Sequence, residues 1–136
     1  MKSKILLIAA GLVLTAQAYA NNDDSCGPWA ASGKWVMYQA AVSDGFQHTG
    51  RCELKIKDGT ATGQCVMSNG LDVAVTGPVT VNKNCSASIS LGFDVPNGGP
   101  HIDSDFNVQL TRDREAFAGQ FINTFGVVGL SNGVRR

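Results

Sequence analysis

The chain has 136 residues, 43% of them hydrophobic, with 11 basic and 11 acidic side chains. This length fits a single domain that folds around one core. The basic residues are scattered and form no stripe, which argues against nucleic acid as a partner.

Residues 1–20 have the pattern of a secretory signal peptide. Lys2 and Lys4 precede an apolar run at residues 5–15, and small residues lead up to Ala20. This order of charge, apolar run and small residues is what a signal peptidase reads. The run is too short for a transmembrane segment. We therefore predict cleavage after Ala20 and export to the periplasm or the medium.

Residues 21–33 are polar and contain glycine. We interpret them as an N-terminal arm that precedes a barrel domain at residues 34–136. The chain has four cysteines, and four cysteines in an exported protein predict two disulfides. Cys26 lies in the arm, so one of these disulfides would tie the arm to the domain.

Asp58-Gly59 predicts a two-residue hairpin, because a type I′ turn requires positive φ at both positions. Folding about this turn places Cys52 opposite Cys65, at a non-hydrogen-bonded position where Cα atoms approach to roughly 4.5 Å. This separation allows a disulfide. We predict the Cys52–Cys65 disulfide, which leaves Cys26–Cys85 as the second pair. Zinc is disfavoured, because the sequence contains no C-x-x-C pair.

Beyond the arm, period-two alternation of apolar and polar residues dominates, and turn signals separate the repeats. In the HIDSDFNVQL stretch, for example, Ile102, Phe106 and Val108 share one face of a strand, while Asp103 and Asp105 share the other. The predicted strands are residues 34–43, 46–56, 60–68, 71–81, 86–93, 101–111, 114–122 and 125–134.

Eight short consecutive strands predict an all-β fold, a small up-and-down antiparallel β-barrel stapled by the disulfides. Closure of the barrel removes exposed sheet edges. A small β-sandwich is the alternative. The first strand, residues 34–43, is apolar on both faces, which fits coverage by the N-terminal segment or by a partner.

Three stretches, GPVTVNKNCSASISLGF, FNVQLTRDREAF and INTFGVVGLSNGVRR, resemble a group of small exported bacterial proteins. In that group a glycine-rich hairpin precedes a V-N-x-x-C-[ST] strand, and the chain closes on a glycine-rich strand with terminal arginine. The resemblance covers residues 50–136. It implies a calycin-like or allene-oxide-cyclase-like barrel and carries over no catalytic residue. The matching positions are Val81, Asn82, Cys85, Ser86, Gly129 and Arg135.

Large residues at predicted inward positions either fill such a barrel or line a cavity for one small ligand. His48 shares the parity of Gly50 and Cys52 if the strand at 46–56 is unbroken, so it would point inward and orient a ligand. A position at the rim, or a bulge at Gly50, is the alternative. The candidate ligand-binding residues are Trp35, Met37, His48, Phe93, Phe106, Phe117 and Phe121.

His101, Asp103 and Asp105 share one strand face and could attract a divalent ion. Side chains two residues apart on a strand are about 7 Å apart, which is too far for one tight site. We assign no metal site here, and interpret the three residues as a solvated face.

The first functional hypothesis is a small apolar or amphipathic ligand bound in the barrel. The second is a protein-binding module, an exported inhibitor or an envelope-associated structural protein, that uses the loops and the strand from His101 to Asp105. The third is a cyclase or isomerase on the same barrel. The sequence displays no pair of acid and base groups, so we assign no catalytic residue and no cofactor.

Overall fold

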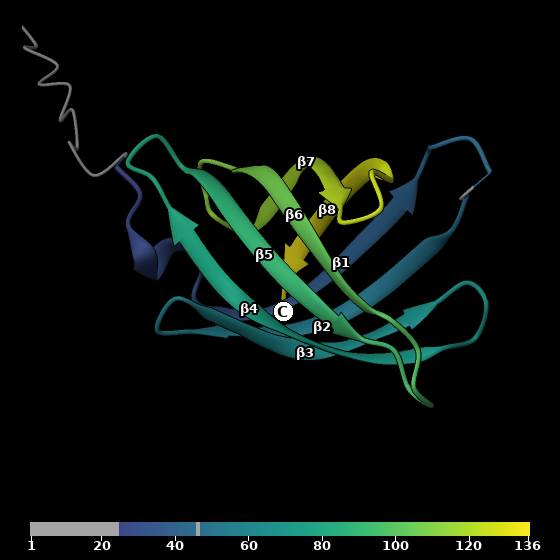
Figure 1. Ribbon diagram of the computed structural model, residues 1–136. Coiled ribbons are helices and arrows are strands. Elements are labelled where there is room, and N and C mark those ends of the chain that lie inside the picture. The colour runs from purple at the N-terminus through teal and green to yellow at the C-terminus, as the bar shows by residue number, and fades with distance from the viewer. Residues whose placement is uncertain (1–24, 46) are drawn as a thin grey trace, which may run out of the picture.

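The computed structural model describes residues 25–45 and 47–136. The predicted signal peptide and the first residues of the arm lie outside these ranges. The described residues form one short 3-10 helix, η1 (Pro28–Ala31), and eight strands (Figure 1). The strands are β1 (Gly33–Ala41), β2 (Thr49–Lys57), β3 (Thr60–Met67), β4 (Asp72–Val81), β5 (Ser86–Asp94), β6 (His101–Leu110), β7 (Ala116–Asn123) and β8 (Val128–Arg135).

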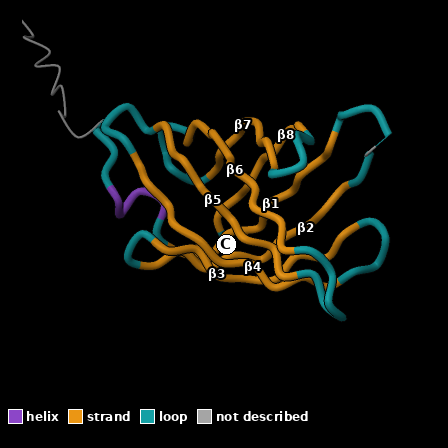
Figure 2. The backbone as a smooth tube through the Cα atoms, in the orientation of Figure 1, coloured by secondary structure: helices purple, strands orange, loops and turns teal. Residues whose placement is uncertain are grey.

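Each strand pairs antiparallel with its neighbours in the chain, and β8 pairs with β1, so the sheet closes (Figure 2). The predicted up-and-down barrel is therefore confirmed, and the sandwich alternative is wrong. A barrel leaves no strand edge with unpaired backbone groups. No helix in the described part of the chain is long and apolar enough to cross a membrane.

The β2–β3 hairpin has the predicted register. Asp58 and Gly59 have φ values of 50° and 73°, as the type I′ turn requires. Cys52 lies opposite Cys65 and is bonded to it, with 3.9 Å between the Cα atoms. The second disulfide joins Cys26 to Cys85, so both predicted pairings are confirmed.

The strand expected to start at residue 46 begins at Thr49 instead. Ala41 donates its amide hydrogen to the His48 carbonyl (2.8 Å), and this is where β1 and β2 separate. The amide of the next residue, Val42, donates its hydrogen to the carbonyl of Val128 on β8 (3.0 Å). Beyond Ala41, the backbone therefore pairs with β8 and no longer with β2. His48 consequently lies in the β1–β2 loop, one residue before β2 begins.

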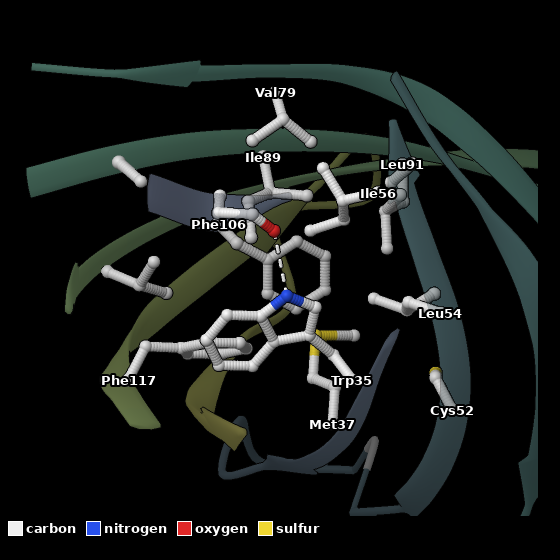
Figure 3. Close-up of a cluster of buried hydrophobic side chains, with 14 of the residues drawn as sticks. Trp35, Met37, Cys52, Leu54, Ile56, Val79, Ile89, Leu91, Phe106 and Phe117 are labelled. Atoms are coloured by element: carbon white, nitrogen blue, oxygen red, sulfur yellow. Dashed lines mark hydrogen bonds between the residues drawn. The ribbon is translucent and has the colours of Figure 1, made fainter. Parts of the chain in front are cut away.

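Inward side chains fill the middle of the barrel (Figure 3). Trp35, Met37 and Phe106 are among the largest fully buried side chains. Two ring pairs connect the strands: Trp35 with Phe117, at 5.3 Å between centroids, and Phe106 with Phe121, at 5.2 Å. These separations are typical of favourable aromatic contacts. The middle of the barrel is therefore a packed core.

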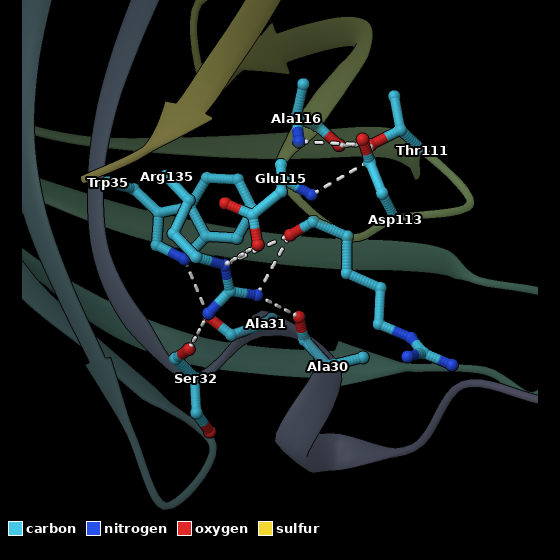
Figure 4. Close-up of polar contacts among 10 residues, drawn as sticks. Ala30, Ala31, Ser32, Trp35, Thr111, Asp113, Glu115, Ala116 and Arg135 are labelled. Atoms are coloured by element: carbon cyan, nitrogen blue, oxygen red, sulfur yellow. Dashed lines mark hydrogen bonds and ion pairs between the residues drawn. The ribbon is translucent and has the colours of Figure 1, made fainter.

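The described part of the N-terminal arm, which contains η1, lies against one end of the barrel (Figure 4). The Trp35 indole N–H donates to the Ala31 carbonyl (2.7 Å), and Arg135 donates to the carbonyls of Ala30 (2.7 Å) and Ser32. The Arg135 guanidinium also lies over the Trp35 ring, 4.7 Å from its centroid. These contacts satisfy carbonyl groups of the arm and hold η1 against the core, so this end is closed.

Candidate functional site

The opposite end of the barrel carries the β1–β2, β3–β4, β5–β6 and β7–β8 loops, on the right in Figure 1. A pocket of about 390 Å³ lies among the first three of these loops. We call it the open-end pocket. Its lining consists of Gly45, Gln47, His48, Met67, Ser68, Asn69, Leu71, Val73, Phe93, Val95 and Ile102.

The floor of the open-end pocket is apolar and belongs to the strands. Val73, Phe93 and Ile102 point inward from β4, β5 and β6, and Phe93 and Ile102 are direct cross-strand partners. Ile102 is only partly buried, because it packs on the core and still faces the pocket. The floor thus joins the apolar core directly through Val73 and Phe93, which belong to it.

The rim of the open-end pocket is polar. The Asn69 side chain accepts the Leu71 amide hydrogen (3.1 Å), which shapes the β3–β4 loop, and the Ser68 hydroxyl accepts that of Thr49 (3.2 Å). His48 is half-buried on the other side of the pocket. An apolar floor with a few polar groups at its edge is the usual composition of a small-molecule site.

Two of the residues predicted to contact a ligand, His48 and Phe93, line the open-end pocket. The other five lie below it in the packed core: Trp35, Met37, Phe106, Phe117 and Phe121. The barrel is therefore filled along most of its length and hollow at one end. Alternation along the strands identified inward residues, but it carried no information on depth along the barrel axis.

Sequence reasoning did not single out Met67, Leu71, Val73, Val95 or Ile102 as pocket residues. Their position in the predicted strands could have identified these residues. Each lies within a few residues of a loop at the same end of the predicted barrel, and only side chains near a strand end can face an opening. Which end is open depends on the arm, which the strand pattern does not place.

A larger hollow of about 510 Å³ lies on the outside of the barrel, where Tyr38, Arg51 and Leu130 contribute to its walls. The outward side chains of Tyr38 and Leu130 are substantially exposed. This hollow is a depression between exposed side chains. We place the candidate site in the smaller open-end pocket, because there apolar strand residues meet at the core.

On the outer face of β5 and β6, polar side chains hydrogen-bond to one another. His101 lies between Asp94 (Nδ1 to Oδ1, 2.9 Å) and Asp103 (Nε2 to Oδ1, 3.0 Å), while Asp105 accepts from the Ser90 hydroxyl (2.6 Å). The hydrogen bonds of His101 to Asp94, which has the larger effect, and to Asp103 raise the pKa of His101. Within the described ranges, no three His, Cys, Asp or Glu side chains are placed to hold a metal ion.

No protein-family model and no curated protein matches the sequence. Solved β-barrels do match it. A redesigned beta barrel, mFAP1, bound to DFHBI is 17% identical with a TM-score of 0.62, and the match covers 81% of this chain and 98% of that one. EF1p2_mFAP2b bound to DFHBI is 13% identical with a TM-score of 0.64, covering 81% and 96%.

A third barrel, the redesigned b11L5F_LGL, is 16% identical with a TM-score of 0.62, over 81% of this chain and 95% of that one. At such identities the likeness shows the fold. It defines the chain as a small closed eight-stranded β-barrel, as the sequence resemblance implied. Membership in the group of small exported bacterial proteins has no support among these matches and stays a prediction.

Proposed function

We propose that this protein is exported and binds one small apolar or amphipathic molecule in the open-end pocket. The observation that carries the proposal is the pocket itself, about 390 Å³ in volume, floored by Val73, Phe93 and Ile102 and edged by His48. Ligand pockets in proteins span about 300–1,000 Å³, so this volume fits a compact molecule. Burial of apolar ligand surface on the floor supplies affinity.

The packed core limits the ligand's length. Phe106 and Met37 are fully buried below the pocket, so a long acyl chain would have to displace them. In this proposal the ligand stays at the open end of the barrel, above Phe106 and Met37, and these deeper residues support the floor. Two solved barrels of the same fold are bound to DFHBI, a small molecule, which is consistent with small-ligand binding by this architecture.

Two disulfides support the export part of the proposal. Cys26–Cys85 and Cys52–Cys65 are both formed, and disulfides persist in oxidising compartments outside the cytosol. Cleavage after Ala20 would leave Cys26 close to the new N-terminus. N-terminal sequencing of the protein recovered from the medium or periplasm tests this, and recovery of an intact leader there would contradict it.

The binding test uses N-phenyl-1-naphthylamine, an uncharged dye whose fluorescence rises in apolar surroundings. Ile102→Lys places a charge at the pocket floor, where desolvation is costly, and should weaken dye binding by about tenfold or more. Ile122→Lys is the matched control, because Ile122 is exposed on the outside of β7. Equal affinities for the two variants would contradict the proposal.

The second candidate function is protein binding. The observation that favours it is a strip of outward apolar side chains on β1, β7 and β8, where Ile122 and Val128 are direct partners and Leu130 is exposed nearby. Exposed contiguous apolar surface often marks an interaction site. If Ile122→Lys abolishes dye binding and Ile102→Lys does not, the outer strip is the binding surface and this candidate replaces the first.

A further inference from the structure

Two buried polar side chains lie in the barrel interior on neighbouring strands. Gln39 on β1 and Ser131 on β8 are direct cross-strand partners and both point inward. Gln39 is 5% exposed and Ser131 is 4% exposed. Partner side chains on one sheet face have Cβ atoms about 5 Å apart, so a single group can contact both.

The polar atoms of this pair are not satisfied within the described chain. Neither the Gln39 Oε1 atom nor the Ser131 hydroxyl has a hydrogen-bond partner among the described residues. The nitrogen of the Gln39 amide, Nε2, donates to the Met67 sulfur at 3.8 Å and to no other atom of the described residues, and a thioether is a weak acceptor. Buried polar groups are almost always hydrogen-bonded, so the pair requires a further partner.

A row of side chains connects this pair to the open-end pocket. Ser131, Gln39, Gly50 and Met67 are successive cross-strand partners on β8, β1, β2 and β3. A Cβ atom at Gly50 would lie 2.9 Å from both Gln39 Nε2 and Met67 Sδ, so the glycine is what lets these two side chains meet. Met67 itself lines the open-end pocket.

Met67 is therefore the side chain that separates the pocket from the polar pair. It is only partly buried and packs on the edge of the core. Methionine is unbranched and has three rotatable bonds, so it adapts easily to a changed cavity. A ligand on the pocket floor can displace the thioether toward the rim and place its own polar end where Met67 now contacts Gln39.

We propose that Gln39 and Ser131 recognise the polar end of an uncharged ligand that carries a hydroxyl or amide N–H, with Met67 as the movable side chain between them and the pocket. This inference rests on the proposed function. Oε1 of Gln39 accepts the ligand's hydrogen, and the Ser131 hydroxyl donates to the ligand's oxygen. The four residues of the row carry no charged side chain, so an ionised group would be buried there without a counter-charge.

The test compares two probes of similar shape, 2-naphthol and 2-methylnaphthalene, with the protein labelled for NMR at methionine methyls and glutamine side-chain amides. Binding of either probe should shift the Met67 methyl signal, and also the Gln39 amide, because Met67 contacts Gln39 Nε2. The Gln39 amide shift should be clearly larger with 2-naphthol, which replaces that contact with a hydrogen bond. 2-Naphthol should bind at least about tenfold more tightly than 2-methylnaphthalene, because one buried hydrogen bond contributes up to about tenfold in affinity and its hydroxyl group makes two here. Gln39→Met and Ser131→Ala should each reduce this preference.

Gln120→Met is the matched control, because Gln120 is exposed on the outside of β7, and it should keep the preference intact. Equal affinity of the two probes, or a preference that survives Gln39→Met and Ser131→Ala, would overturn the inference and leave a buried water as the partner of the pair. If neither probe shifts Met67 or the pocket residues, the proposed function itself fails. Ser131→Ala keeps the test valid if Gln39→Met does not fold.

Discussion

Trp35 offers the sharpest test of how the closed end of the barrel is held. Its side chain is 1% exposed, its indole N–H donates to the Ala31 carbonyl, and its ring packs against Phe117 and beneath Arg135. Trp35→Phe retains a ring but leaves the Ala31 carbonyl without this donor. An orphaned buried acceptor costs about 1–3 kcal/mol of unfolding free energy.

Trp35→Ala should cost more, about 3–5 kcal/mol, because it also leaves a cavity in the core. Trp29→Ala is the control. That ring is 58% exposed and contacts Arg114 with 4.4 Å between its centroid and the guanidinium carbon, and an exposed cation–π contact contributes about 0.5–1 kcal/mol. The expected order of destabilisation is Trp35→Ala, then Trp35→Phe, then Trp29→Ala.

Urea denaturation followed by far-UV circular dichroism measures these differences. With a slope of about 1–3 kcal/mol per molar urea, Trp35→Ala should lower the midpoint by roughly 1 M or more. Trp35→Phe should bind the naphthylamine dye as the unmodified protein does, since Trp35 lies at the closed end. A Trp35→Ala midpoint no lower than that of Trp29→Ala would refute this account of the closed end.

Three further outcomes follow from individual contacts. Gly77→Ala should destabilise the barrel by about 3 kcal/mol, because the added Cβ would overlap a backbone carbonyl of β5; a thermal midpoint unchanged from the parent protein would contradict this. Replacing Cys26 and Cys85 together by alanine should cost about 4 kcal/mol in the chain-entropy model, given their separation of 59 residues, and urea titration under non-reducing conditions checks it. NMR titration should show that the pKa of His101 lies above its usual value, and the Asp94→Asn substitution should lower the pKa of His101. Since folding raises this pKa, the stability that His101 contributes is complete below about pH 6.5 and is lost as the pH rises through the folded-state pKa; an unchanged pKa in Asp94→Asn would argue against the ion pair.

The eight strands, apart from the start of β2, and the disulfide of the β2–β3 hairpin could be predicted from the sequence. Alternation of period two in the chain encodes which side chains face the core, because successive strand residues point to opposite faces. Asp58-Gly59 fixes the hairpin register, and the register brings Cys52 to Cys65. These features depend on near neighbours in the chain, so local rules sufficed to predict them.

The open end of the barrel and the position of the candidate site could not be predicted from the sequence. The arm reaches the closed end through contacts between distant segments, Ala30 and Ser32 with Arg135, and no local pattern specifies that meeting. The same holds for the pairing of Gln39 with Ser131 across the β1–β8 seam, which exists only because the sheet closes. Alternation gives the face of a side chain, whereas its depth along the barrel axis depends on closure, and that depth separates the pocket residue Phe93 from the core residue Phe106.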